Sequence, residues 1–336
     1  MRRKMTNCIR LFFIIFMIIH LASCDNNDNK QVNIHPDMKV AKWDNTKYAD
    51  WESSVGLDVY NANSFNTEDE NSNKANKILY IENLNDPITL KFNNNGKKRN
   101  FIVTVYYDYE QIPFKISETN DYDLHYKFEL DDGYEAELLL YLPRDLKMEG
   151  NHKLLISFTI GHDINAKDIS GQSDWYGMNA VYDIVYDIND VEFIDYHTYE
   201  KATKTIDQTY RFTLNEDFHY SILDTNILPH VNKVITIKPG EKLNLMYHAS
   251  TLGSDAEKIL LLATIGFEQV NIDGKKYKLL EIPTGETGIG EIALTAPEQP
   301  GFYEVIALAV SNPFAKINDE SNFEVYSSVR FTLEVK

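Results

Sequence analysis

The side chains best able to do chemistry in this 336-residue chain are its 51 acidic residues and nine histidines. Asp183, Asp187 and Asp190 flank one apolar stretch, and Asp187-x-Asn189 has the spacing with which a calcium loop begins. The glycine and distal glutamate of such a loop are missing, and Asp25-x-Asn27-x-Asn29 fails in the same way. We therefore expect solvated carboxylates here, with a calcium site as the alternative.

Other catalytic and metal-binding patterns are also missing. The histidines show no His-Glu-x-x-His or His-x-His spacing, and the chain has no Gly-x-Ser-x-Gly sequence. Gly285-x-x-Gly288-x-Gly290 resembles a phosphate loop only in spacing, because a strand and not a helix is predicted to follow it. Choosing one carboxylate pair for glycoside hydrolysis from so many acids would be arbitrary. We expect no enzymatic activity, no metal and no cofactor.

The stretch with the clearest binding potential is the predicted loop 161–177. It carries His162, Asp174, Trp175 and Tyr176, which we take as candidate ligand-binding residues. Trp175-Tyr176 lies between small residues, where two rings could form an exposed platform for a sugar or a peptide. The alternative is that both rings pack against the core or against a seam between domains, since large aromatic side chains dominate packing wherever they can be buried.

The amino-terminal segment has the order of a signal peptide. A basic start is followed by the apolar run Leu11–Ile19 and by Leu21-Ala22-Ser23-Cys24. The apolar run is shorter than the roughly 20 residues that a membrane-spanning helix needs. Leu21-Ala22-Ser23-Cys24 resembles the bacterial lipobox, which implies cleavage before Cys24 and attachment of two or three acyl chains to this cysteine. An ordinary cleaved signal and an uncleaved signal anchor are the alternatives.

Export with a lipid anchor would place the chain on the extracytoplasmic face of the cell membrane. Cleavage would remove Cys8 and leave Cys24 as the sole cysteine, so that no intrachain disulfide forms. It would also remove four of the 33 basic residues; the remaining 29 against 51 acidic residues give a formal charge of −22. Such a charge disfavours binding to nucleic acid and to anionic lipid, so that membrane attachment depends on the anchor.

Beyond residue 77 the apolar pattern has a period of two. Phe101, Val103 and Val105 share one face of a segment, and Leu154 and Ile156 share one face of another, as expected of half-buried strands. Turn sequences separate fourteen such segments. The predicted strands are 78–82, 88–92, 101–107, 122–130, 135–142, 153–160, 180–188, 234–237, 242–248, 258–267, 276–282, 289–295, 302–310 and 325–335.

Two halves of this strand-rich region align with each other. Gly150-Asn151-His152-Lys153-Leu154 lines up with Gly301-Phe302-Tyr303-Glu304-Val305, and in each half this stretch opens the penultimate strand. Val181-Tyr182 likewise aligns with Val325-Tyr326 as the start of the last strand. This internal similarity predicts tandem domains of one fold.

Gly301-Phe302-Tyr303-Glu304-Val305 resembles the Gly-x-Tyr-x-Cys corner of immunoglobulin-like domains. The resemblance implies that the Tyr303 hydroxyl bonds to the backbone before the strand. Val305 replaces the cysteine, and His152 replaces the tyrosine in the first repeat. Seven strands in about 110 residues is also the number expected of an immunoglobulin-like sandwich. We therefore predict an all-β chain with two tandem immunoglobulin-like β-sandwiches.

The predicted organisation has five parts. They are a cleaved lipoprotein signal peptide (1–23), the lipidated cysteine with a flexible tether and an irregular arm (24–76), a first sandwich (77–195), a linking region (196–230) and a second sandwich (231–336). The functional hypothesis is a non-catalytic binding module at the bacterial cell envelope, with an envelope protein or a glycan as ligand. A carbohydrate- or cell-wall-binding accessory to a hydrolase and a structural spacer are the alternatives.

Overall fold

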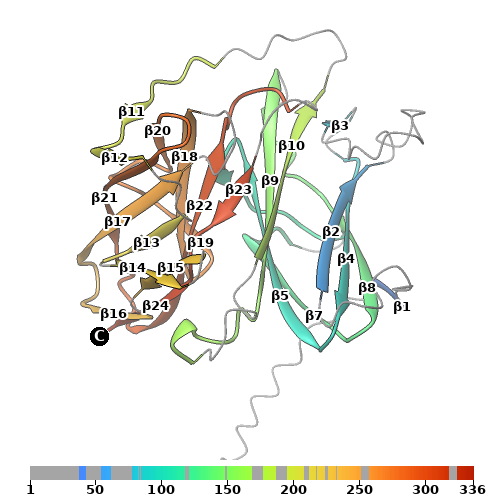
Figure 1. Ribbon diagram of the computed structural model, residues 1–336. Helices are drawn as coiled ribbons and strands as arrows, with labels where there is room; N and C mark the ends of the chain where they lie inside the picture. Colours follow the sequence, from blue (N-terminus) through green and yellow to red (C-terminus); the bar gives the residue numbers. More distant parts are fainter. Residues whose placement is uncertain are drawn as a thin grey trace, which may run out of the picture. The chain divides into compact units, whose positions relative to one another are not determined.

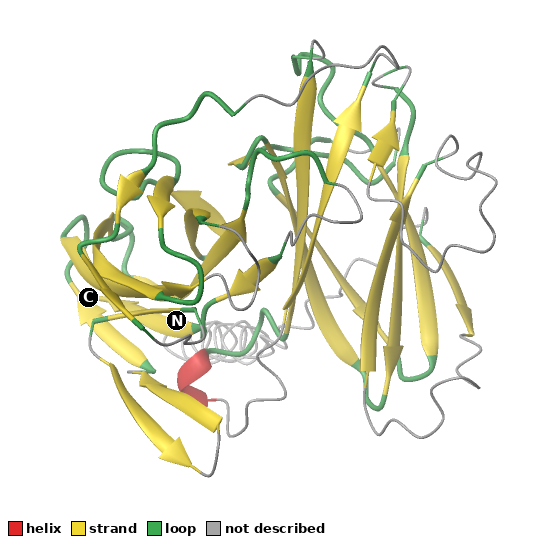
Figure 2. Cartoon of the chain, turned by 45° about the horizontal axis from the view of Figure 1, so that its top comes forward, coloured by secondary structure: helices red, strands yellow, loops and turns green. Residues whose placement is uncertain are grey.

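The computed structural model is built almost entirely of β-strands (Figure 1). It describes residues 38–42, 54–61, 78–81, 83, 85–117, 121–147, 150–168, 177–186, 195–207, 212–216, 218–223, 226–231, 233–250, 257–317 and 324–336. All of these belong to one compact unit, Ile34–Lys336. Within the described residues the only helical segment is the 3-10 turn η3 (Ala166–Asp168), shown in red in Figure 2. No helix among them is long and apolar enough to cross a membrane.

The first sandwich consists of two sheets, with strand orders β1-β8-β4-β2 and β3-β10-β9-β5-β6; β7 also pairs with β5. Its strands are β1 (Lys39–Lys42), β2 (Ser54–Tyr60), β3 (Ile78–Tyr80), β4 (Ile88–Asn95), β5 (Arg99–Tyr107), β6 (Glu110–Gln111), β7 (His125–Leu130), β8 (Tyr134–Leu140), β9 (Asn151–Ile160) and β10 (Gly177–Val185).

The second sandwich has sheets β12-β21-β17-β13 and β11-β20-β18-β22-β24-β16, with β19 on β18 and β23 on β22; β14 and β15 form a separate hairpin. The strands are β11 (Glu200–Lys201), β12 (Lys204–Ile206), β13 (Thr213–Asn215), β14 (Phe218–Leu223), β15 (Asn226–Val231), β16 (Val234–Ile237), β17 (Lys242–Ser250), β18 (Lys258–Ile265), β19 (Glu268–Val270), β20 (Lys278–Glu281), β21 (Thr287–Thr295), β22 (Gly301–Ser311), β23 (Val325–Ser327) and β24 (Phe331–Val335).

The two sandwiches share one topology. The sheet order β1-β8-β4-β2 corresponds strand by strand to β12-β21-β17-β13, and β3-β10-β9-β5 corresponds to β16-β24-β22-β18. In each case one pair is parallel, β3 with β10 and β16 with β24, while the pairings among the remaining corresponding strands are antiparallel. The short strands β6 and β19 also correspond, each folding back on β5 or β18. The prediction of tandem immunoglobulin-like β-sandwiches is confirmed.

Each sandwich encloses its own apolar core between its two sheets. In the first core, Phe92 packs against Phe128 and Phe158 with ring centroids 5.0 and 5.3 Å apart. In the second, Leu245 and Tyr247 of β17 pack among residues that include Leu261 of β18. Strands β4 and β8 alternate between buried and partly exposed side chains, as half-buried strands do. In each sandwich this core holds the two sheets face to face.

Strands β5, β9, β18 and β22 depart from the predicted half-buried pattern. From Phe101 to Tyr107 in β5, and from His152 to Ile160 in β9, every residue is buried. β18 is buried from Ile259 to Ile265. These strands are covered on both faces, because a third apolar cluster joins the sheet of β9 to the sheet of β22. Their near-continuous apolar sequences are typical of strands without a solvent-facing side.

The predicted domain boundaries also change. The irregular arm predicted within 24–76 contains β1 and β2, which are the two edges of the first sheet. Val55, Leu57 and Val59 of β2 pack against the first core, so this segment belongs to the first sandwich. The linking region 196–230 likewise contains β11, β12 and β13, which pair with β20, β21 and β17. The predicted tether, residues 25–30, lies outside the described residues.

One part of the repeat alignment is wrong. The alignment of Lys153 with Glu304 fits the strand correspondence, but the register places Tyr182 opposite Leu154 and Tyr326 opposite Ala309. Tyr182 therefore corresponds to Phe331, which lies opposite Val305. The last strand of the second sandwich is interrupted between β23 and β24, and this interruption shifts the Val-Tyr pair out of alignment.

Candidate functional site

The most elaborate side-chain arrangement in the described part of the chain lies between the two sandwiches, and we call it the seam. Its apolar part joins the outer face of the β9 sheet to that of the β22 sheet. Buried residues from the first sandwich include Tyr106, Leu155 and Val181, and Leu260 and Leu308 are among those from the second. Burying such side chains stabilises the contact by roughly 25 cal/mol per Å² of apolar surface. The seam is thus a third core, shared by both sandwiches.

Gln111 of β6 and Gln269 of β19 join the sandwiches by reciprocal hydrogen bonds. The backbone N–H of Gln111 donates to Oε1 of Gln269 at 2.7 Å, and that of Gln269 donates to Oε1 of Gln111 at 2.6 Å. Each side-chain Nε2 then donates across the seam, from Gln111 to the carbonyl of Phe267 at 3.0 Å and from Gln269 to that of Tyr109 at 2.9 Å. The corresponding edges of the repeats thus meet with local two-fold pseudosymmetry.

The turns before these glutamines have the same unusual backbone. Tyr109 has φ of 66° and Phe267 has φ of 71°, both in the left-handed region that bulky residues rarely occupy. The sequences Tyr109-Glu110-Gln111 and Phe267-Glu268-Gln269 are an internal repeat that the sequence analysis missed. The aromatic-Glu-Gln triplet after an apolar strand was the available signal. It marks the positions where the two sandwiches meet.

Lys153 of β9 and Asp183 of β10 form a buried ion pair in the seam. The side chains are 3% and 0% exposed, and Nζ lies 2.5 Å from Oδ1. Both also contact the second sandwich, because Lys153 Nζ donates to the carbonyl of Ala315 and the N–H of Ile317 donates to Asp183 Oδ2 at 2.7 Å. Burial lowers the pKa of Lys153 and raises that of Asp183, while the opposite charge of each partner counteracts both shifts.

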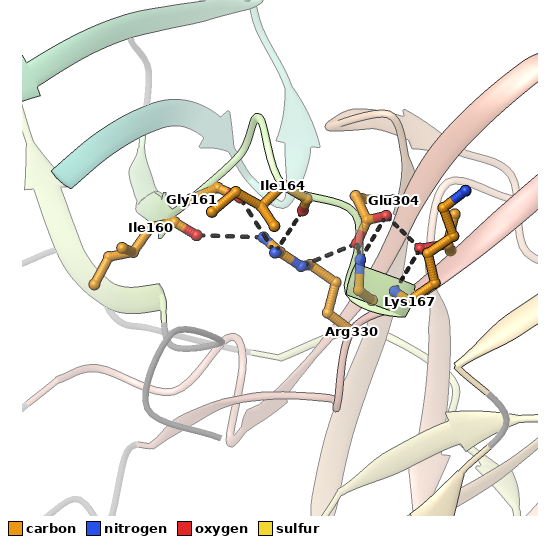
Figure 3. Close-up of polar contacts among 8 residues, drawn as sticks. Ile160, Gly161, Ile164, Lys167, Glu304 and Arg330 are labelled. Carbon is orange, nitrogen blue, oxygen red and sulfur yellow. Dashed lines mark hydrogen bonds and ion pairs between the residues drawn. The ribbon is translucent and has the colours of Figure 1, made fainter. Parts of the chain in front are cut away.

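A second buried ion pair joins Glu304 of β22 to Arg330, with 3.0 Å between Nε and Oε2 (Figure 3). The Arg330 guanidinium points into the turn that follows β9 and donates to the carbonyls of Ile160, Gly161 and Ile164 at 3.3, 3.2 and 2.9 Å.

The Glu304 carboxylate completes this contact. It accepts from the N–H of Ala166 at 3.2 and 3.1 Å and from the Thr332 hydroxyl at 2.7 Å. Burial raises the pKa of Glu304 and lowers that of Arg330, and the attraction between the two opposes both shifts. The pair and its hydrogen bonds hold the turn after β9 on the second sandwich.

The two ion pairs are related by the repeat but have opposite polarity. Lys153 and Glu304 occupy aligned positions, one basic and one acidic. Each pair holds the loop that follows the corresponding strand of the other sandwich: the loop after β22 in one case and the loop after β9 in the other. Removing one partner of such a pair typically costs about 3–5 kcal/mol, because it leaves a buried charge without compensation. The seam therefore combines apolar packing with two ion pairs, each of which fixes one loop of the opposite sandwich.

The predicted tyrosine corner is present in the second sandwich. The Tyr303 hydroxyl donates to the carbonyl of Gln299 at 2.9 Å, as the resemblance implies. In the first sandwich His152 takes the aligned position, and its Nδ1 lies 2.7 Å from Oδ2 of Asp108. Asp108 also accepts the N–H of Lys153 at 2.9 Å. The histidine therefore anchors the corner through a carboxylate in place of a backbone carbonyl.

The candidate ligand loop is only partly described. His162 lies at the seam, with its ring 6.4 Å from that of Phe267 in an edge-to-face arrangement. Burial, with Lys127 as the next cause, lowers the pKa of His162 to about 4. Asp174, Trp175 and Tyr176 lie outside the described residues, so these positions stay a prediction. The first half of the loop, up to η3, is held by the second sandwich.

The acidic cluster and the glycine-rich stretch that the sequence suggested for metal or phosphate binding have structural roles where they are described. Asp183 belongs to the buried ion pair, and Asp187 and Asp190 lie outside the described residues. Across the described ranges no group of three or more His, Cys, Asp or Glu side chains is arranged to hold a metal ion. Gly288 and Gly290 lie within β21, where a Cβ would collide with Ile282 or Tyr247, so close packing explains these glycines.

The segment that leads into the second sandwich is fixed at Asp195. This carboxylate accepts from Lys258 Nζ and from the Tyr199 hydroxyl, both at 2.8 Å, and from the N–H of His197 at 3.0 Å. Although burial opposes the shift, these donors together lower the pKa of Asp195 to about 2. The His197 ring stacks on Phe314 with centroids 3.7 Å apart. These contacts attach the connecting segment next to the seam.

Comparison with known proteins adds no family. No protein-family model and no curated protein matches the chain. Solved structures with similarity include the Streptococcus agalactiae AgI/II polypeptide BspA C-terminal domain (7% identity, 84% of this chain and 100% of that chain, TM-score 0.21) and the E. coli chaperone DraB (11%, 84% and 98%, TM-score 0.24). The Salmonella enterica SafA pilin in complex with the SafB chaperone has 11% identity over 82% and 96%, with a TM-score of 0.21.

All three TM-scores lie far below 0.5, so the fold rests on the strand order of the chain itself. The two-sandwich architecture is compatible with a non-catalytic interaction module. The buried charged groups of the seam contact one another and the loops of the opposite sandwich. That arrangement is suited to holding two domains in fixed register.

Proposed function

We propose that this chain is a non-catalytic interaction module of the bacterial cell envelope, in which two immunoglobulin-like sandwiches act as one rigid unit on a lipid anchor. The seam is the observation that carries this proposal. Four of the five buried Asp, Glu, Lys and Arg side chains in the described residues belong to its two ion pairs, and the fifth, Arg99, bonds to Asn94 and neighbouring carbonyls. Buried charge in this part of the chain therefore serves structure.

A rigid pair of sandwiches suits recognition of a protein or glycan because little conformational entropy is lost on binding. Loops at the sandwich ends and the outer sheet faces are the surfaces that such a scaffold presents. The strongly acidic composition favours partners other than nucleic acid. The proposed ligand is therefore an envelope protein or glycan.

The anchor is proposed at Cys24, supported by the lipobox-like Leu21-Ala22-Ser23-Cys24. The test compares the wild-type chain with Cys24→Ala, with and without globomycin, by membrane fractionation and intact mass. The expected result is an acylated, membrane-bound wild-type protein and an unacylated variant. An unmodified Cys24 in the wild-type protein would contradict the anchor.

The binding role is tested with the same two proteins in intact cells. In-cell crosslinking should capture a reproducible envelope protein or glycan with the wild-type chain, and Cys24→Ala should reduce capture, because it removes the chain from the membrane. The rigid seam also suits a second role, a spacer that holds another element at a distance from the membrane. A spacer predicts no captured ligand and no binding on a glycan array.

A further inference from the structure

The Lys153–Asp183 pair has a chemical property that its counterpart in the second repeat lacks. The two residues lie directly opposite each other on β9 and β10, and both side chains are almost fully buried. An amine and a carboxyl group are thus in contact away from water. In the second repeat, Glu304 faces the guanidinium of Arg330, which stays protonated and is not a nucleophile. Of the two buried ion pairs, Lys153–Asp183 alone holds the two reactants of an amide condensation.

The contacts around Lys153 and Asp183 match the needs of an amide. A secondary amide has one N–H donor and one carbonyl acceptor. Lys153 Nζ already donates to the carbonyl of Ala315, and Asp183 Oδ2 already accepts the N–H of Ile317 at 2.7 Å. Both contacts persist if Nζ bonds to Cγ of Asp183 and Oδ1 departs. The second sandwich therefore supplies a complementary donor and acceptor for the condensed form.

We propose that Lys153 and Asp183 condense to an intramolecular amide that crosslinks β9 to β10. The lysine ammonium first transfers one proton to Oδ1, which gives a neutral amine and a carboxylic acid. Nζ then attacks Cγ, and the N–Cγ bond forms. A second proton passes from Nζ to Oδ1, the Cγ–Oδ1 bond breaks, and water leaves. The third nitrogen-bound hydrogen remains as the amide N–H, and Oδ2 becomes the amide oxygen, so that atoms and charges balance.

Three features of the site favour this step. Burial shifts the pKa of Lys153 downward and that of Asp183 upward, which favours the neutral reactants. The fixed contact between Nζ and the carboxyl group removes the entropy cost of bringing the reactants together. The Ile317 N–H donates to the oxygen on which negative charge develops in the tetrahedral intermediate. Since Ala315 and Ile317 belong to the second sandwich, condensation follows docking of the two sandwiches.

The crosslink would also have a structural consequence. It closes a covalent loop from Lys153 to Asp183, which contains the whole of the predicted ligand loop 161–177. The base of that loop would then stay closed even if the local sheet opens. This consequence concerns stability and is independent of which ligand the protein binds.

The test is peptide mass spectrometry of the full-length protein, extracted from membranes, denatured and digested with trypsin. Without the amide, trypsin releases residues 148–153, 154–167 and 168–201 as separate peptides. With it, cleavage after Lys153 is blocked. Residues 148–167 then appear joined to 168–201, with a mass lower than the sum of the two peptides by one water. A wild-type digest containing the free 148–153 peptide and no joined species would overturn the proposal.

Two variants serve as controls. Lys153→Arg keeps the positive charge but cannot condense, so the joined peptide is absent. Asp183→Asn presents a carboxamide that gives the same amide on losing ammonia, so the joined peptide returns with the wild-type mass. If the joined peptide is still found in Asp183→Ala, Lys153 is linked to another carboxyl group, and this result would also overturn the assignment. Because the wild-type digest is the primary readout, the test stands even if a variant folds poorly.

Discussion

Arg330 connects the two sandwiches through contacts that were not expected from the sequence. Its guanidinium satisfies three carbonyls of the turn after β9 while it pairs with Glu304 of its own sandwich. A repeat alignment places Lys153 and Glu304 at matching positions, but it does not reveal that each reaches a loop of the other sandwich. That information depends on how two folded domains dock, which no local pattern encodes.

Arg330→Ala should destabilise the protein by about 3–5 kcal/mol, because Glu304 would keep a buried charge without its partner. Urea denaturation followed by circular dichroism measures the loss. The matched control is Lys336→Ala, which removes the exposed partner of Glu334 and should leave the denaturation midpoint unchanged. Equal midpoints for Arg330→Ala and the wild-type protein would contradict the structural role of the pair.

Tyr303→Phe tests the corner that the sequence predicted. The variant keeps the ring and loses only the hydrogen bond to the Gln299 carbonyl, so a loss of about 0.5–1.5 kcal/mol is expected. Tyr196→Phe removes a hydroxyl from a residue that is 83% exposed and serves as the control. Thermal unfolding of the three proteins compares them directly. A Tyr303→Phe curve that overlays the control would show that the corner hydrogen bond adds no stability.

For the strands, the sequence predicted the faces that pack in the two cores but not the opposite faces that pack in the seam. Period-two alternation located the strands around Phe101 and Leu154 because one face of each sheet packs in the usual way. The burial of the second face was missed, although Leu260, Leu262 and Leu308 interrupt the alternation with apolar residues. β1 was missed because it is an exposed edge strand with little apolar sequence. β2 was missed although Val55, Leu57 and Val59 alternate, since its pairing partner β4 lies far along the chain.

The reciprocal contact of β6 with β19 is open to a double-mutant cycle. Gln111→Ala removes two of the four exchanged hydrogen bonds and Gln269→Ala removes the other two. Because all four bonds belong to one contact between the same two strands, the effects of the two changes should be non-additive. A coupling of about 0.5–3 kcal/mol is expected for residues in direct contact. Chemical denaturation of the wild-type, single and double variants measures it. Additive losses would mean that the two glutamines act independently and that the reciprocal contact is absent in solution.

For the whole molecule, acid should lower stability over the pH range set by two histidines, the partly buried His162 and the buried His248. Burial lowers the pKa of both His162 and His248 to about 4 in the folded state, against a usual value of 6.5. The unfolded chain therefore takes up protons first as the pH falls, and stability decreases from about pH 6.5 to about pH 4, below which this contribution levels off. Thermal melts at stepped pH measure the change.

His162→Gln is the variant for this prediction, because a neutral side chain at the seam cannot be protonated. Its stability should fall less steeply over the same pH range, while His248 continues to contribute. The lowered pKa of Asp195 acts in a separate, more acidic range: the stability gained from its donors is lost as the pH falls from about 4 toward 2. Identical pH profiles for His162→Gln and the wild-type protein would contradict a role for His162.

The seam makes the two sandwiches one rigid unit, and double electron–electron resonance tests this rigidity. Spin labels would be placed at Lys39→Cys in β1 and Lys238→Cys after β16, both highly exposed, in a background in which Cys8 and Cys24 are both replaced by serine. A rigid unit gives one narrow distance distribution, which broadens when Arg330→Ala is added. A broad distribution in the protein with an intact seam would contradict it.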